Sequence, residues 1–290
     1  MFVHGWPELW YSWRHQIDHV AGMGYRAAAL NVRGYGGSSN PTDIARYTIR
    51  ELTGDVAAVI DELGDGPAVV VGHDWGAPVA WNTARLHADR VRAVMGMSVP
   101  YMPVGPTSSI DLWKEIYADR FFYQLYFQEP GVVEAEVGAD PARSLRTIYY
   151  GASGESSDLL LQEKGPDATL LEGGVDQLPR HLTDDDIAVY VEAYERSGWH
   201  GPFNRYRAQG LDAADIGQLE GGELTQPTAF VGGELDPVRR FMPGMDLFEL
   251  APASCNDFRG STIIDGAGHW VQQEAPAETN AALRAFLDSL

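Results

Sequence analysis

The sequence predicts an α/β protein with a mostly parallel central sheet, helices on both faces, and a helical segment inserted between two parts of the sheet. In the first hundred residues, short apolar runs bounded by glycine alternate with helical patterns, which is typical of parallel strands joined by crossover helices. Strand-like runs then nearly vanish until Gln226. A chain of 290 residues lies near the upper size for one hydrophobic core, which favours a single domain with an insertion.

The elements of the first part follow in order along the chain. Ala27–Val32 is an expected strand. Apolar residues recur with helical spacing between Ile49 and Leu63, and Thr48 and Gly64 are suitable residues to begin and end a helix there. The pattern then predicts a strand at Pro67–Val71, a helix at Ala77–Leu86 and a strand at Val91–Met97.

The remaining elements complete a core that is divided in sequence. We expect residues 1–99 to form its first part, residues 100–217 the helical insert, and residues 218–290 its second part. Strands are expected at Pro227–Val231 and Ser261–Ile264. Pro276 opens a closing helix, and the apolar residues expected on one face of it are Leu283, Phe286, Leu287 and Leu290.

Composition and charge narrow the classes of function. The net charge of −20 disfavours nucleic acid as a partner and favours neutral or apolar ligands. No apolar run is long enough to cross a bilayer, and the first residues lack the pattern of a signal peptide. The single cysteine, Cys255, cannot form an internal disulfide, so we expect a cytoplasmic protein. The eight histidines show no metal-ligand spacing, so we expect no metal. We also expect no organic cofactor, because the reaction inferred below needs only water as its second substrate.

The most informative motif is Gly-His-Asp-Trp-Gly at residues 72–76, where an expected strand meets an expected helix. Small residues on both sides permit a sharp turn that lifts the side chain of Asp74 above the carboxyl end of the sheet, as in a nucleophile elbow. By itself, the motif is equally compatible with an aspartate that merely caps a helix.

Two later loops supply an acid and a histidine. Asp236 and His269 each follow an expected strand, so the chain order is nucleophile, acid, histidine, which is the order of the α/β-hydrolase triad. Glu234 and Asp265 are rival acids, but Asp236 lies further beyond its strand. The motif His-Gly-Trp-Pro at residues 4–7 is expected to present the backbone N–H of Trp6 beside that of Trp75, and the two form an oxyanion hole.

An aspartate at the elbow has a chemical consequence. A carboxylate that attacks an sp³ carbon forms an ester, which water can cleave, whereas a serine would form an ether, which water cannot cleave. Asp74 therefore predicts alkyl transfer followed by hydrolysis, with His269 as the base for water.

With further motifs at residues 33–36, 123–131 and 201–207, the sequence resembles the soluble epoxide hydrolases of the α/β-hydrolase fold over nearly its whole length, including the hydrolase domain of the mammalian enzyme. The resemblance implies that the insert is a helical cap and that epoxide and water are converted to a vicinal diol. It also implies that Tyr123 and Tyr206 donate hydrogen bonds to the epoxide oxygen, and that Trp75 and Gln124 bind the substrate.

One departure from the family concerns the start of the chain. The family has two strands and most of a third ahead of the motif at residues 4–7, where this sequence has three residues. Two explanations stay open: the numbered sequence starts at a late methionine, or the sheet has an exposed edge, which favours association into a homodimer.

Rival functions also stay open at this point. A haloalkane or haloacid dehalogenase uses the same aspartate chemistry, and Trp75 could serve a halide. The cap tyrosines favour epoxide opening instead. A non-catalytic binding protein on the same fold usually loses a triad residue, and none is missing here. A serine esterase is disfavoured because the elbow has no hydroxyl.

Overall fold

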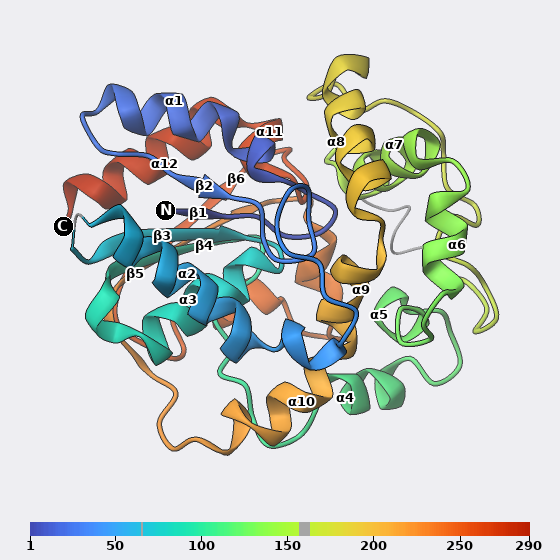
Figure 1. The fold of residues 1–290 in the computed structure, drawn as a ribbon, viewed down its shortest axis with the longest axis horizontal. Coiled ribbons are helices and arrows are strands. Elements are labelled where there is room, and N and C mark those ends of the chain that lie inside the picture. Colours follow the sequence, from blue (N-terminus) through green and yellow to red (C-terminus); the bar gives the residue numbers. More distant parts are fainter. Residues whose placement is uncertain (65, 157–162) are drawn as a thin grey trace.

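The computed structural model describes residues 1–64, 66–156 and 163–290 (Figure 1). One six-stranded sheet has the strand order β2-β1-β3-β4-β5-β6, and all its pairings are parallel. The strands are β1 (Phe2–Val3), β2 (Ala29–Leu30), β3 (Ala68–His73), β4 (Val91–Met97), β5 (Leu224–Gly233) and β6 (Cys255–Ile264). The predicted fold class is confirmed, and the sheet is parallel throughout.

Helices pack on both faces of this sheet (Figure 1). One face is covered by α1 (Arg14–Gly22), α11 (Val271–Glu274) and α12 (Pro276–Asp288), and the other by α2 (Ile49–Leu63) and α3 (Gly76–Leu86). Neighbouring residues of a strand belong to opposite layers: Val70 is buried in the core on the α2 side, whereas Val71 is buried against the α1 side. Both faces of the central strands are therefore apolar, as a covered parallel sheet requires.

The helix predicted between Thr48 and Gly64 is confirmed with both of its ends. The Thr48 side chain accepts a hydrogen bond from the backbone N–H of Glu51, and Gly64 ends the helix at a φ of 72°. The predicted strand at residues 91–97 is also confirmed. Periodicity and capping residues identify these elements because both are local properties of the chain.

The two edge strands differ most from the predictions. The strand expected at residues 27–32 is reduced to β2, because the backbone N–H of Val32 is bound by the His4 ring at 3.0 Å instead of by a neighbouring strand. At the other edge, β6 begins six residues before the predicted Ser261, since its exposed residues break the apolar pattern. Association along the β2 edge stays a prediction.

The closing helix begins at Pro276, as predicted, and buries Leu283, Phe286 and Leu287. Leu290 does not join this face: it lies beyond the end of α12 and is 38% exposed.

An inserted helical region lies between β4 and β5. Its helices are α4 (Ser109–Ile116), α5 (Tyr123–Tyr126), α6 (Val132–Gly138), α7 (Pro141–Ala152), α8 (Asp184–Ser197), α9 (His200–Arg207) and α10 (Gln209–Ala214). In Figure 1, α5 to α9 lie at the end of the molecule opposite the two chain termini, and α4 and α10 lie along its lower side. The predicted bounds of the insert, 100 and 217, stay predictions, and residues 157–162 within it lie outside the described part.

Short 3₁₀ helices connect the main elements. They are η1 (Trp10–Trp13), η2 (Ile44–Tyr47), η3 (Ala88–Arg90), η4 (Ile216–Gln218), η5 (Pro237–Arg240) and η6 (Leu247–Leu250). Within the described residues, no helix has the length and apolar character needed to cross a membrane.

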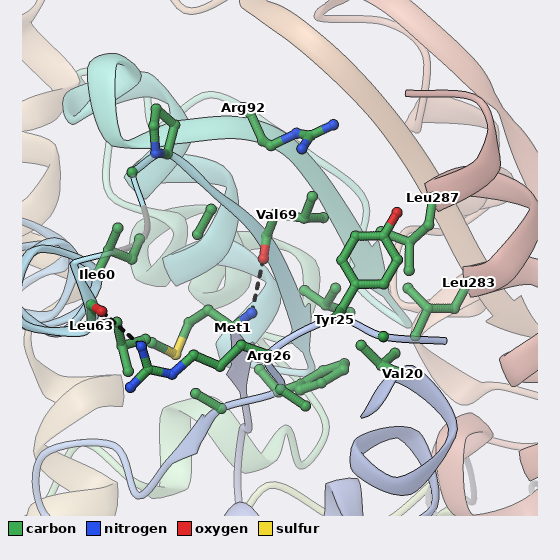
Figure 2. Close-up of a pocket in the computed structure, with 18 residues that line it drawn as sticks. Met1, Val20, Tyr25, Arg26, Ile60, Leu63, Val69, Arg92, Leu283 and Leu287 are labelled. Carbon is green, nitrogen blue, oxygen red and sulfur yellow. Dashed lines mark hydrogen bonds between the residues drawn. The ribbon is translucent and has the colours of Figure 1, made fainter. Parts of the chain in front are cut away.

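A cavity of about 390 Å³ lies at the amino ends of the strands (Figure 2). The Met1 amine donates a hydrogen bond to the Val69 carbonyl at 2.9 Å, and Arg26 donates to the Leu63 carbonyl at 2.8 Å. Its lining shares no residue with the cavity at the carboxyl ends of the strands, where ligands of open parallel sheets bind.

Candidate active site

Asp74 occupies a sharp turn between β3 and α3. Its φ of 50° lies in the left-handed region, which aspartate adopts at a cost that the surrounding structure must offset. Gly72 and Gly76 make this turn possible: a Cβ at Gly72 would overlap the backbone of Gly76, and one at Gly76 would overlap the backbone of Val3. The small residues on both sides of Asp74 therefore permit an elbow, as the sequence predicts.

The structure brings Asp74, Asp236 and His269 together. His269 Nε2 lies 3.2 Å from Asp74 Oδ2, and His269 Nδ1 lies 3.1 Å from each carboxylate oxygen of Asp236. Asp236 is 1% exposed. The rival acids Glu234 and Asp265 are exposed. Of the three predicted acids, Asp236 is the one in contact with the imidazole.

The electrostatics of His269 follow from its two carboxylate neighbours. Burial by itself lowers the pKa of the imidazole, but the charge and hydrogen bonds of Asp236, followed by those of Asp74, raise this pKa well above its ordinary value of 6.5. In the resting site, the two carboxylates therefore favour the protonated form of His269.

A backbone N–H holds the second oxygen of the Asp74 carboxylate. The N–H of Trp6 donates to Asp74 Oδ1 at 2.7 Å. A Cβ added to Gly5 would overlap both Asp74 Oδ1 and the backbone nitrogen of Trp75, so the two predicted donor groups lie on the same side of the carboxylate. Among the described residues, the Trp6 N–H donates a hydrogen bond to Asp74, whereas the Trp75 N–H shows none to Asp74. This arrangement suits an oxyanion hole in which Gly5 cannot be replaced.

A buried polar network behind the triad was missed by the sequence reasoning. Glu8 Oε2 lies 2.6 Å from His73 Nδ1, and His73 Nε2 donates to the backbone carbonyl of His269 at 2.7 Å. Ser98 Oγ donates to the same carbonyl at 2.8 Å. Burial alone would raise the pKa of Glu8, but the charge and hydrogen bond of His73 lower it to about 2. The network therefore holds the backbone of His269 through an ionised, fully buried carboxylate.

The one sequence feature that points to this network is the position of Glu8 directly after the motif at residues 4–7. Glu8 lies beside one motif and His73 inside another, which is consistent with a contact between them. Because 65 residues separate the two, the sequence pattern alone does not pair them.

The insert contributes two tyrosines above Asp74. The rings of Tyr123 and Tyr206 lie 6.0 Å apart, and the ring of Tyr206 lies 5.3 Å from that of Trp75. Phe127 packs against both tyrosines at 5.3 and 4.9 Å. Tyr206 is 1% exposed, whereas Tyr123 is partly exposed.

Both phenols are neutral in this environment. Burial and then the negative charge of Asp74 raise the pKa of Tyr123 and of Tyr206 above the ordinary value of 10.0. A neutral phenol retains its proton at physiological pH and can donate a hydrogen bond.

A cavity at this end of the sheet has a volume of about 640 Å³. It is lined by Asp74, Trp75, Tyr123 and Gln124, whereas Tyr206 and His269 are not among its lining residues. The remaining walls are largely apolar and include Met102, Leu112, Trp113, Phe241, Met242, Met245 and Leu250. The described lining includes two acids, Asp74 and Asp212, and no basic residue.

Among residues 1–64, 66–156 and 163–290, no group of three or more His, Cys, Asp and Glu side chains could hold a metal ion. The mechanism without metal or organic cofactor stays a prediction from the sequence.

Comparisons with known proteins agree with this geometry. A family model described as alpha/beta hydrolase fold matches residues 1–276. Epoxide hydrolase A of Mycobacterium tuberculosis is 39% identical over an alignment that covers 100% of this chain and 90% of that protein. A solved epoxide hydrolase from an endophytic Streptomyces is 41% identical, with a TM-score of 0.93, and the match covers 99% of this chain and 88% of that chain. Epoxide hydrolase A from Mycobacterium thermoresistibile is 40% identical, with a TM-score of 0.91 and coverage of 99% and 90%. The chain belongs to the epoxide hydrolases of the α/β-hydrolase fold.

Proposed function

We propose that this epoxide hydrolase converts an apolar epoxide and water to a vicinal diol through a covalent ester on Asp74. One observation carries the proposal. The two oxygens of the Asp74 carboxylate have different partners, since Oδ1 accepts the Trp6 N–H at 2.7 Å while Oδ2 lies 3.2 Å from His269 Nε2. The same side chain lines a cavity that also contains Tyr123.

In the first step, Asp74 Oδ2 attacks an epoxide carbon and the carbon–oxygen bond of the ring breaks. The electron pair of that bond goes to the epoxide oxygen, which becomes an alkoxide and takes a proton from a tyrosine. Tyr123 and Tyr206 are the donors in this proposal, and their neutral state supports it. The phenolate then regains its proton from solvent.

In the second step, water attacks the carbonyl carbon of the ester. Alkylation has converted Asp74 to a neutral group, so one of the two carboxylates that raise the pKa of His269 is gone. The imidazole can then release its proton and accept one from water, while Asp236 stabilises the imidazolium that forms. The negative charge of the intermediate develops on Asp74 Oδ1, at the Trp6 N–H. When the intermediate collapses, the bond between the Asp74 carboxyl carbon and Oδ2 breaks, Oδ2 leaves as part of the diol, and the proton held by His269 passes to it.

We further propose that the substrate is neutral. The cavity has apolar walls and acidic residues, and the chain carries a net charge of −20, so an anionic epoxide would meet repulsion both at a distance and inside the site. The helices of the insert serve as its cap, because Tyr123 and Gln124 come from α5 and line the cavity together with Asp74. The lone cysteine supports a cytoplasmic location.

A single turnover in heavy-oxygen water tests the covalent route. The label is expected in the Asp74 side chain, and the diol from that turnover is expected to carry the original light oxygen of the aspartate. Label in the diol with an unlabelled aspartate would contradict the ester.

A substrate panel tests the reaction class and the charge preference. An aryl epoxide, a terminal alkyl epoxide and a haloalkane are compared for the release of diol and of halide. A long-chain epoxide is added as its free acid and as its methyl ester, and the ester is expected to have the higher kcat/KM. Halide without diol would indicate dehalogenation instead.

A further inference from the structure

Three side chains from different helices of the insert form a hydrogen-bond chain that ends on Tyr123. Gln124 Nε2 donates to the Tyr123 phenol oxygen at 3.1 Å. Gln209 Nε2 donates to Gln124 Oε1 at 3.3 Å, and Ser109 Oγ donates to Gln209 Oε1 at 2.5 Å. Ser109 opens α4, Gln124 belongs to α5 and Gln209 opens α10. The chain therefore links three helices to one phenol.

A backbone group sets the direction of this chain. Gln209 Nε2 also donates to the Tyr206 carbonyl at 3.0 Å. A carbonyl oxygen only accepts hydrogen bonds, so the atom of Gln209 that faces Tyr206 and Gln124 must be the nitrogen. The atom of Gln124 that faces Gln209 is then its oxygen, and the nitrogen of Gln124 is directed to Tyr123. The orientation of both amides thus depends on the main chain of the second tyrosine.

The donor on the phenol oxygen constrains the phenol's own proton. A phenol oxygen carries one hydrogen, which lies near the plane of the ring and points to one of two sides. With the N–H of Gln124 directed at the oxygen on one side, the O–H is left to point to the other. Tyr123 and Gln124 both line the cavity that contains Asp74, so a substrate oxygen is the available acceptor there.

We propose that Gln124 is a positioning residue that directs the Tyr123 proton toward the epoxide, and that Gln209 holds Gln124 in the orientation this requires. The inference rests on the proposed function, in which Tyr123 protonates the opened ring. It replaces direct substrate binding by Gln124 with an action through Tyr123.

The same contact assists the proton transfer itself. As the phenol gives up its proton, negative charge develops on its oxygen, and the hydrogen bond from Gln124 strengthens with that charge. Burial and the charge of Asp74 raise the pKa of Tyr123, whereas the hydrogen bond from Gln124 lowers it. Gln124 and Gln209 are 9% and 6% exposed, so water does not readily replace either amide.

The test is a double-mutant cycle on the alkylation rate constant, measured as rapid-quench formation of the ester by intact mass. Gln124→Met keeps the length of the side chain and removes the donor, and it is expected to slow alkylation about tenfold, the scale of one hydrogen bond. In the Tyr123→Phe background, the same substitution is expected to have no further effect, because the phenol through which it acts is absent. Gln218→Met, at an exposed residue of η4, is the matched control and is expected to leave the rate unchanged.

Gln124→Glu provides a second readout that a purely structural role would not affect. Its carboxylate keeps the acceptor for Gln209 but accepts the Tyr123 proton, so alkylation is expected to be slower than in Gln124→Met at neutral pH. Protonation of the new carboxyl restores a donor, so the rate relative to that of the wild type is expected to recover as the pH falls.

The outcomes separate the two proposals. If Tyr123→Phe leaves alkylation unchanged, the role of Tyr123 in the proposed function is wrong and this inference is overturned with it. If Tyr123→Phe slows alkylation but Gln124→Met slows both backgrounds equally, the proposed function stands and the inference is overturned. A Gln124→Glu rate ratio that does not vary with pH would also contradict it.

Discussion

The active site has a core side, formed by the loops at the strand ends, and a cap side, formed by the inserted helices. The two sides hold their polar groups by different means. On the core side, backbone groups dominate: the Trp6 N–H binds Asp74, and His73 and Ser98 both bind the carbonyl of His269. On the cap side, the Tyr123 phenol is held by the side-chain amide of Gln124, and that amide by Gln209. On the core side a backbone group takes part in each of these contacts, whereas on the cap side the main chain acts at the far end of the hydrogen-bond chain, where the Tyr206 carbonyl accepts from Gln209. The backbone therefore fixes the positions of Asp74 and His269 directly, and that of the Tyr123 phenol through two intervening side chains.

The largest expected effect comes from removing the nucleophile on the core side. Asp74→Ala is expected to lower the alkylation rate by about 10⁴-fold or more, because no other carboxylate lines the cavity within reach of His269 in the described structure. The measurement is epoxide consumption in a single turnover. Diol formation at a rate close to that of the wild type would mean that water attacks the epoxide directly.

His269→Gln is expected to separate the two chemical steps. Ring opening needs the ionised Asp74 and the cap tyrosines, so it stays partly intact, whereas ester hydrolysis loses its base and slows by about 10²- to 10⁴-fold. Intact-mass measurement is expected to show protein heavier by one substrate. Asp265→Asn, at an exposed acid of the neighbouring loop, serves as the control and is expected to accumulate no adduct. An unmodified mass of His269→Gln during epoxide consumption would argue against the covalent route.

The cap tyrosines are expected to have smaller effects that are confined to alkylation. Tyr206→Phe and Tyr123→Phe each remove one donor to the alkoxide, and each is expected to raise the alkylation barrier by about 1 to 3 kcal/mol. Hydrolysis of the ester, followed after the epoxide is exhausted, is expected to change little in either variant. If a tyrosine variant slows hydrolysis as much as alkylation, the tyrosines do not act in alkylation alone and the contrast between core side and cap side is wrong.

The smallest perturbation is the removal of one charge beside His269. Asp74→Asn removes a carboxylate that raises the pKa of the imidazole, so this pKa is expected to fall below that of the wild type, as an NMR titration of the imidazole Cε1–H would show. An unchanged pKa would mean that the Asp74 charge does not act on His269.

The raised pKa of His269 also predicts how the free energy of unfolding depends on pH. The folded pKa of His269 lies above its ordinary value of 6.5, so the ion pairs of His269 contribute stability that is complete below that value. This contribution is lost as the pH rises through the folded pKa. Asp74→Asn is expected to reduce it, and urea unfolding at a series of pH values measures the difference.

Local sequence patterns were sufficient to predict several helices and strands and to propose the site residues at the strand ends. The helix α2 has apolar periodicity, a capping threonine and a terminating glycine, all of which act within a few residues. Asp74, Asp236 and His269 could be proposed because each follows a strand, and the carboxyl ends of parallel strands meet at one edge of the sheet. The edge strands were less predictable, since exposed residues in β6 and a side-chain contact at Val32 interrupt the strand pattern.

By itself, the sequence determined an α/β protein with a parallel sheet, an elbow aspartate and a chain order of nucleophile, acid and histidine. The sequence also favoured Asp236 over the other two acids, and the structure places it at His269. Tertiary structure alone decided that Glu8 pairs with His73 across 65 residues, and that Gln209 reaches Gln124 across 85 residues. The physical reason is that periodicity, capping and turn chemistry operate between neighbours in the chain. Contacts between buried polar side chains depend instead on how separate helices and strands pack, and no local pattern records that packing.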